Sequence, residues 1–266
     1  MSKKTENAKF AKEWCEQVES SEKWMNYIKR SLDNVLIRKD ELIKEDERKY
    51  IKTRVNTSTT EITITSDKTH KTLVDLIENG VSYGIGVLNF ASYYKPGGGF
   101  LKGSFTQEES LCTVSGLYQI LSRLSVYECR RKSKDIAPCY NDEIIYNPSV
   151  PFTLEIGNTK HPRTVDVISC SPPNCNRITM ADRADYEESI KKRIEAIYLL
   201  PYMQGVDTLI LGAWGCGVFK NDPKVIARHF IDIMDKYPNI YDRVIFACGS
   251  NANQKIFENA FIQKPE

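Results

Sequence analysis

The chain has 266 residues, enough for one large domain or two small ones with a substantial buried core. Its 37 lysine and arginine residues nearly balance 35 aspartate and glutamate residues, which argues against the broad basic surface that nonspecific nucleic-acid binding requires. The start of the sequence lacks the apolar stretch of a secretory signal, and no window approaches the ~20 apolar residues of a membrane span. The eight cysteines lack the close spacing of a disulfide framework. We therefore expect a soluble, intracellular protein, cytoplasmic or nuclear, without membrane association.

Residues 8 to about 50 form a charged segment with a helical pattern. Phe10, Trp14 and Val18 recur every four residues, which places an apolar stripe on one face of a helix. Docking of this helix on the main body explains the stripe better than the binding of a partner. The character of the sequence changes near residue 58.

After Ser58, apolar strand segments alternate with helical segments. Strands are expected at residues 61–65, 83–91, 164–170, 208–214 and 243–249, and helices at residues 69–79, 186–200 and 223–236. This alternation predicts an α/β fold with a mostly parallel sheet covered by helices on both faces. We predict two parts, a helical N-terminal extension over residues 1–57 and an α/β domain over residues 58–266.

Two glycine-rich loops follow strands of the expected sheet, at the edge where such sheets bind ligands. They are "SYYKPGGGFLKG", after the strand that ends near Phe90, and "GAWGCGVFKND", after the strand that ends near Leu211. The first loop is not a P-loop, because Ser104 follows Gly103 where a P-loop has lysine. The nearby "GIGVLN" is not a dinucleotide-binding motif, because it lies within a strand and not after it. Glycine lets backbone N–H groups approach phosphate oxygens, so the two loops could hold a diphosphate between them. Tight turns that merely need glycine are the alternative.

The triplet Gln107-Glu108-Glu109 lies at the far end of the first loop. The apolar positions of "SLCTVSGLYQILSRL", directly after it, predict a single helix over residues 110–124. Acidic residues at a helix N-terminus are common because they complement the helix dipole. Their position on the same loop as three consecutive glycines nevertheless points to a ligand site, because the loop can bend a carboxylate back toward a ligand.

A Gly-Gly-Gly followed after a short gap by Gln-Glu-Glu resembles the signature of the poly(ADP-ribose) glycohydrolases, and "VLNFAS", "QEESLC" and "GAWGCGVF" are similar to the microbial branch of that family. The resemblance spans about residues 60–250. It implies a macrodomain-like fold, with a mixed, mostly parallel sheet between helices, and would make residues 58–266 the catalytic domain. It also implies an enzyme that hydrolyses the ribose–ribose O-glycosidic bonds of poly(ADP-ribose) and releases ADP-ribose.

The resemblance also implies roles for single residues. Glu109 would be the catalytic residue, and Glu108 would help to hold the terminal ribose. Ser92 stands where many macrodomains that cleave mono-ADP-ribose have asparagine, which argues against that chemistry. The residues implied to bind the ribose and the diphosphate are Asn89, Gly97, Gly98, Gly99, Gln107, Gly215, Cys216, Gly217, Val218 and Phe219.

The chemistry of glycoside hydrolysis is consistent with this assignment. Breaking such a bond needs an acid to protonate the departing oxygen and a base to activate water, and one carboxyl group can do both in sequence. Glu109 would have to carry its proton at neutral pH, which burial and the neighbouring Glu108 favour because they disfavour a second negative charge. Phe219 would orient the sugar and exclude bulk water.

The scheme needs no metal ion or other cofactor, and the sequence offers no cluster of metal ligands. His70, His161 and His229 are far apart in the sequence, and the pair Cys170 and Cys175 has no further ligands nearby. The expected partners are poly(ADP-ribose) or ADP-ribosylated proteins as substrate and ADP-ribose as product, with no sequence-specific binding of nucleic acid. Two alternatives stay open, an ADP-ribose-binding module without activity and a hydrolase of ADP-ribose linked to protein or nucleobase.

Overall fold

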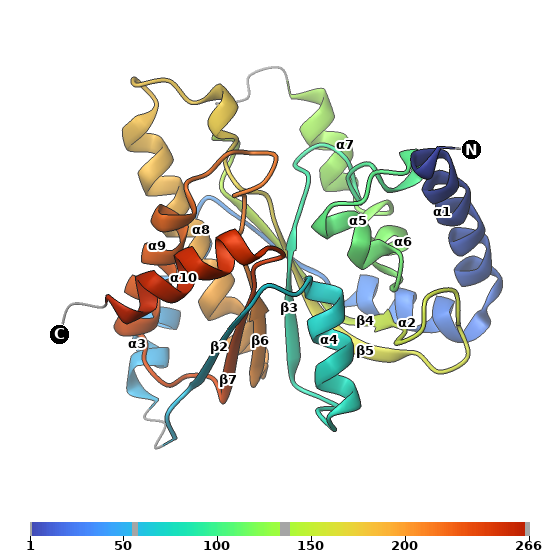
Figure 1. The fold of residues 1–266 in the computed structure, drawn as a ribbon, viewed down its shortest axis with the longest axis horizontal. Helices are drawn as coiled ribbons and strands as arrows, with labels where there is room; N and C mark the ends of the chain where they lie inside the picture. The colour runs from blue at the N-terminus through green and yellow to red at the C-terminus, as the bar shows by residue number, and fades with distance from the viewer. Residues whose placement is uncertain (1, 55–57, 134–138, 264–266) are drawn as a thin grey trace.

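The computed structural model describes residues 2–54, 58–133 and 139–263, and this part of the chain contains a seven-stranded sheet (Figure 1). The strand order is β1-β4-β5-β3-β6-β7-β2. The pairs between β5, β3, β6, β7 and β2 are parallel, whereas β4 runs antiparallel to both of its neighbours, β5 and β1. The strands are β1 (Leu36–Lys39), β2 (Glu61–Thr65), β3 (Ile85–Phe90), β4 (Glu143–Phe152), β5 (Arg163–Cys170), β6 (Thr208–Leu211) and β7 (Arg243–Ala247). The predicted α/β fold with a mixed, mostly parallel sheet is confirmed.

Helices cover both faces of the sheet (Figure 1). One face carries α1 (Lys3–Ser20), α2 (Glu22–Asp33), α4 (Thr69–Glu78), α5 (Gln107–Cys112), α6 (Leu117–Leu121) and α7 (Ser125–Lys132). The other carries α3 (Glu45–Thr53), α8 (Arg183–Met203), α9 (Pro223–Lys236) and α10 (Asn251–Ile262). Successive strand residues point to opposite faces, so Val87 lies in one core and Leu88 in the other.

The first 54 residues wrap around one edge of this sheet, and they are not helical throughout as the pattern of residues 8–50 predicted. Helices α1 and α2 pack on one face, and α3 packs on the other. Between them β1 pairs with β4 as the edge strand of the sheet. Its four residues alternate between half-buried and exposed, a pattern too short to recognise in the sequence. The predicted boundary after residue 57 falls outside the described residues and stays a prediction.

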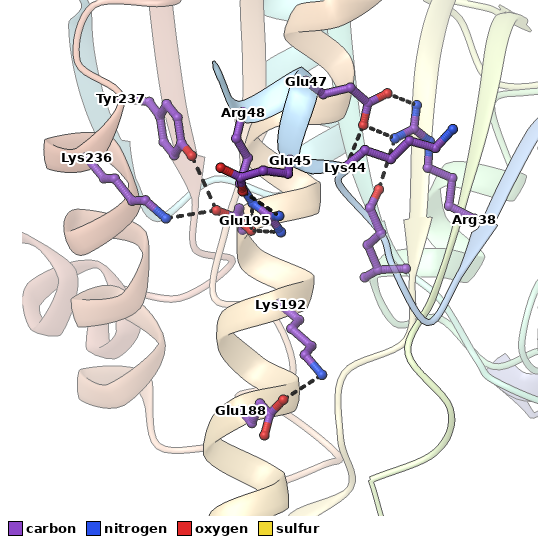
Figure 2. Close-up of polar contacts among 11 residues, drawn as sticks. Arg38, Lys44, Glu45, Glu47, Arg48, Glu188, Lys192, Glu195, Lys236 and Tyr237 are labelled. Carbon is purple, nitrogen blue, oxygen red and sulfur yellow. Dashed lines mark hydrogen bonds and ion pairs between the residues drawn. The ribbon is translucent and has the colours of Figure 1, made fainter. Parts of the chain in front are cut away.

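Glu195 on α8 forms ion pairs with one residue of α3 and one residue of α9 (Figure 2). The Arg48 Nη2 atom lies 2.8 Å from Glu195 Oε2 on α8, and the Lys236 Nζ atom on α9 lies 3.0 Å from Glu195 Oε1. Burial would raise the pKa of Glu195, but hydrogen bonds from Arg48 and Lys236 outweigh it and lower the pKa. The charged N-terminal segment therefore contacts a helix of the α/β part of the chain through an ion pair.

The helix predicted over residues 110–124 is interrupted. Helix α5 ends at Cys112 and α6 begins at Leu117, because the backbone between them pairs with the end of β4. The Gly116 N–H donates to the Pro151 carbonyl at 2.9 Å, and the Thr153 N–H donates to the Val114 carbonyl at 2.8 Å. These long-range bonds outweigh the local helical pattern.

Candidate active site

A cavity of about 610 Å³ lies where the parallel strands end. The sheet brings the two glycine loops to it, because β3 and β6 are parallel neighbours and their carboxyl ends lie at the same edge. Nine of the predicted site residues line the cavity: Gly98, Gly99, Gln107, Glu108, Glu109, Gly215, Gly217, Val218 and Phe219. Its size and its mixture of apolar and polar groups suit a ligand of nucleotide size.

Gln107 fixes the start of helix α5 against the end of strand β3. Its Oε1 atom accepts a hydrogen bond from the Phe90 N–H at 2.9 Å, and its Nε2 atom donates to the Leu88 carbonyl at 2.7 Å. The side-chain amide thus occupies the donor and acceptor groups that a neighbouring strand would pair with. This arrangement places the next two residues, both glutamates, over the cavity.

Glu109 is held by backbone groups at both of its oxygens. Its Oε1 atom accepts from the Gly99 N–H at 2.7 Å, and its Oε2 atom accepts from the Thr106 N–H at 2.8 Å and from the Thr106 hydroxyl. The side chain is 5% exposed and lines the cavity. The triple-glycine loop and the N-terminus of α5 therefore set its orientation together.

Glu108 lies deeper, with 3% of its surface exposed. Its Oε2 atom accepts from the Ser92 N–H at 2.8 Å, and its Oε1 atom accepts from Asn89 Nδ2 at 3.3 Å. Burial raises the pKa of Glu108 to about 8, and the charge of Glu109 adds to the rise, although bonds from Ser92, Asn89 and Gly97 oppose it. Glu108 thus favours its neutral, protonated form at pH 7, in contrast to the expectation that its negative charge would help Glu109 to keep a proton.

The glycines of the first loop make room for the carboxyl groups of Glu108 and Glu109 and donate hydrogen bonds to them. A Cβ atom on Gly98 would meet Glu109 Oε1 and would lie 2.9 Å from Glu108 Oε2, and the φ of Gly98 is +62°. The N–H groups of Gly97 and Gly99 donate to Glu108 and Glu109, and that of Gly98 donates to a backbone carbonyl. Within the described residues, none of these three N–H groups is left for a diphosphate, in contrast to the expectation that both loops would hold it.

The second loop presents the free N–H groups instead. Across residues 2–54, 58–133 and 139–263, the backbone N–H groups of Gly217, Val218 and Phe219 have no hydrogen-bond acceptor. All three residues line the cavity, and Gly217 and Val218 are exposed. Successive free N–H groups form a concave anion-binding site.

Asn221, which the sequence reading missed, holds this loop in place. Its Nδ2 atom donates to the Pro173 carbonyl at 2.9 Å and to the Gly215 carbonyl at 3.1 Å. Its Oδ1 atom accepts from the Tyr186 hydroxyl at 3.0 Å and from Cys175 Sγ at 3.4 Å. The partners lie up to 48 residues away, so no local pattern could have revealed this role.

Three of the predicted ligand-binding residues lie outside the cavity lining. Asn89 is fully buried and contacts Ser169 Oγ at 3.1 Å as well as Glu108, so it lies behind the glutamate. Gly97 is buried, and a Cβ atom there would lie 2.8 Å from the Tyr118 ring. Cys216 packs against the core on the α8 side of the sheet. These three residues support the site from behind its surface.

The structure adds a third loop that sequence reasoning missed. Ala247, Cys248, Gly249 and Asn253, at the end of β7 and in the first turn of α10, line the cavity. The signal was present, because β7 is parallel to β6 and Gly249 follows it as glycines follow β3 and β6. Pro172, in the loop after β5, also lines the cavity.

Residues 2–54, 58–133 and 139–263 contain no group of three His, Cys, Asp or Glu side chains that could hold a metal ion. No helix within these ranges is both long and apolar enough to cross a membrane.

Comparisons with known proteins identify relatives of this chain. The family model described as "Microbial-type PARG, catalytic domain" matches residues 11–155. A poly(ADP-ribose) glycohydrolase from Deinococcus radiodurans in complex with ADP-ribose is 28% identical with a TM-score of 0.76, covering 88% of this chain and 97% of that one. The enzyme from Thermomonospora curvata bound to the inhibitor ADP-HPD is 24% identical with a TM-score of 0.79, covering 96% and 99%. No curated protein matches.

Proposed function

The chain belongs to the microbial-type family of poly(ADP-ribose) glycohydrolase catalytic domains, and on that premise we propose that Glu109 is the general acid and base that cleaves the substrate. The enzyme is a glycohydrolase that acts on the ribose–ribose bonds of poly(ADP-ribose) and releases ADP-ribose. One observation carries the assignment of the site: two adjacent carboxyl groups and a row of free backbone N–H groups face the same cavity.

Thr106 allows Glu109 to exist with and without a proton. When Glu109 is ionised, the Thr106 hydroxyl donates to its Oε2 atom. When Oε2 carries a proton, the same hydroxyl can rotate and accept from it, because a hydroxyl is both donor and acceptor. The N–H groups of Gly99 and Thr106 keep the carboxyl group in one orientation in both states. This suits a residue that must give up a proton and recover it.

In the proposed reaction, Glu109 protonates the ribose oxygen that leaves as the bond breaks. The positive charge that develops on the reacting ribose lies close to the carboxylate that this step creates. Glu109 then removes a proton from the attacking water, which completes hydrolysis and restores the acid. Each step moves one proton between Glu109 and an oxygen of the substrate or water.

The other groups hold the substrate. Glu108, neutral at pH 7, can bond ribose hydroxyls without placing a second negative charge beside Glu109. The free N–H groups of Gly217, Val218 and Phe219 bind the diphosphate. The Phe219 ring, partly buried at the cavity wall, packs on the ribose and excludes water from the reacting bond. Together they fix the scissile bond against Glu109.

Incubation with poly(ADP-ribose) tests this proposal. The purified protein is incubated in parallel with polymer and with proteins that carry single ADP-ribose groups, and free ADP-ribose is separated from shortened chains. Release of ADP-ribose from the polymer is expected. Binding of ADP-ribose without any release would instead identify a binding module, and release from the singly modified proteins alone would identify a different hydrolase.

A further inference from the structure

In the described part of the chain, the charged side chains that line the cavity are two glutamates and four lysines. Apart from Glu108 and Glu109, every charged side chain that lines it is a lysine: Lys4, Lys68, Lys95 and Lys102. All four are exposed, and none forms an ion pair with an acidic side chain in the part of the chain that the structure describes. An overall charge of only +2 makes this concentration at one cavity a local feature.

Three of these lysines line the cavity together with Phe105, and we call this set the lysine arc: Lys4, Lys68, Lys102 and Phe105. Lys68 Nζ lies 5.2 Å from the centre of the Phe105 ring, which is 43% exposed. Lys102 precedes Phe105 on the same loop. Lys4 comes from helix α1, whose first turn packs so closely on this loop that a Cβ atom on Gly103 would meet the Lys4 carbonyl oxygen.

The arc lies directly beside the proposed catalytic residue. Phe105 adjoins Thr106, which holds Glu109 Oε2. An exposed aromatic ring among unpaired cations suits a nucleotide unit, because the ring can stack on a base and the cations can neutralise phosphates. The anion-binding N–H groups of the second loop belong to a different wall of the same cavity.

We propose that the lysine arc is a second nucleotide subsite, which binds the ADP-ribose unit joined to the unit that is being released. This inference rests on the proposed function of the cavity. It assigns a role to α1, which supplies Lys4 to the site across 100 residues of sequence. It also gives a physical basis for preferring a polymer to a single ADP-ribose group, because only a polymer has a second diphosphate to place there.

Two other basic residues of the N-terminal segment, Arg38 and Lys39, already pair with acidic side chains. Arg38 pairs with Glu47 at 2.6 Å, and Lys39 pairs with Glu143 at 3.2 Å. Neither lines the cavity. Lys12 is an exposed lysine on α1 outside the cavity, and Lys12→Glu therefore provides a control for Lys4→Glu with the same change of charge on the same helix.

The test compares Lys4→Glu and the double variant Lys4→Glu/Lys102→Glu with Lys12→Glu and the unchanged protein, and Lys4→Glu and Lys12→Glu are the pair with equal change of charge. KM for poly(ADP-ribose) and the Kd of ADP-ribose are measured at several salt concentrations. We expect the double variant to raise KM for the polymer about tenfold and to leave kcat and the Kd of ADP-ribose within about twofold. The plot of log kcat/KM against log salt should become shallower by roughly 0.7 for each lost phosphate contact. Lys12→Glu should behave like the unchanged protein.

Three outcomes would overturn the proposal. In the first, KM for the polymer in the double variant stays unchanged. In the second, Lys12→Glu raises KM as much as Lys4→Glu does. In the third, the Kd of ADP-ribose rises as much as KM, which would place the lysines in the site that binds the released ADP-ribose unit. If the unchanged protein releases no ADP-ribose, the proposed function fails. A filter-binding assay, which measures how much polymer the protein retains on a filter, then tests the lysine arc independently of activity. The proposal then requires loss of retention in the double variant but not in Lys12→Glu.

Discussion

At the scale of single residues, Glu109 depends on hydrogen bonds that a substitution must preserve. Glutamine keeps the shape of the side chain and one acceptor oxygen, but its NH₂ group would face the N–H of Gly99 or Thr106. We expect Glu109→Gln to reduce release of ADP-ribose by ~10²–10⁴-fold, because the amide cannot exchange the proton. The free energy of unfolding should fall by about 1–2 kcal/mol, because one N–H loses its acceptor.

Isothermal calorimetry with ADP-ribose provides the control for this variant, since the affinity should change little if Glu109 acts on the bond rather than on binding. Turnover above about a tenth of the original rate would show that Glu109 is not the acid. Glu108→Gln should reduce turnover less than Glu109→Gln, because its assigned role is to hold the ribose. The reverse order would exchange the two assignments.

Glu108 also predicts a pH dependence of stability. The pKa of Glu108 is about 8 in the folded protein, against an ordinary value of 4.5. Between pH 4.5 and about pH 8, Glu108 therefore keeps its proton in the folded protein and has lost it in the unfolded chain. Because the unfolded state binds fewer protons there, the contribution of Glu108 to stability falls as pH rises through this window. Urea unfolding at pH 5, 6, 7 and 8 should show the unchanged protein losing stability relative to Glu108→Gln, by on the order of a few kcal/mol. Parallel curves would contradict the assigned pKa.

At the scale of elements, the two glycine loops differ in what their glycines contact. A side chain at Gly98 would meet both carboxylates and would need a positive φ, so Gly98→Ala should lower the melting temperature and the activity together. Apart from its two neighbours in the chain, no residue in the described part of the structure has an atom within 4 Å of a Cβ atom placed on Gly217. Gly217→Val should therefore leave the melting temperature unchanged and weaken binding of ADP-ribose, by roughly tenfold. Unchanged affinity would remove the second loop from the binding site.

An element can be predicted from the sequence when the residue pattern that specifies it lies within the element itself. Helix α9 and strand β3 were found because their apolar patterns are long and continuous. Strand β4 was missed because Pro148 and Pro151 interrupt it and its register shifts between Asn147 and Val150. The break between α5 and α6 comes from pairing with β4, which no local propensity encodes.

The same distinction explains the site. The glycine loops and the glutamate pair are short, dense signals in the sequence, and the structure brings them to one cavity. Asn221 and the loop after β7 act through partners that are distant in sequence, so one sequence without structure could not place them. The requirement for Gly98 was also hidden, because the atoms that exclude a side chain there belong to Glu108 and Glu109.

At the scale of the whole molecule, the question is whether the first 57 residues form a separate part. Trp14 and Trp24, both buried, pack edge to face with their ring centres 5.3 Å apart. Trp14 Nε1 donates to the Ser115 carbonyl at 3.2 Å, and Trp24 Nε1 donates to the Thr159 carbonyl at 2.7 Å. Together with β1 and α3, these contacts tie the N-terminal segment to both cores of the sheet.

The three tryptophans of the chain allow this to be measured, because the third, Trp214, lies beyond residue 57. Trp214→Phe leaves fluorescence that reports on the N-terminal segment alone, and Trp14→Phe/Trp24→Phe leaves fluorescence that reports on the remainder. In each variant, we expect the unfolding curve by fluorescence to coincide with that by circular dichroism, because a single cooperative unit loses both signals together. The comparison is made within each variant, so any loss of stability from the substitutions does not affect it. Separate midpoints, with the N-terminal segment unfolding first, would show that residues 1–57 fold as an independent extension.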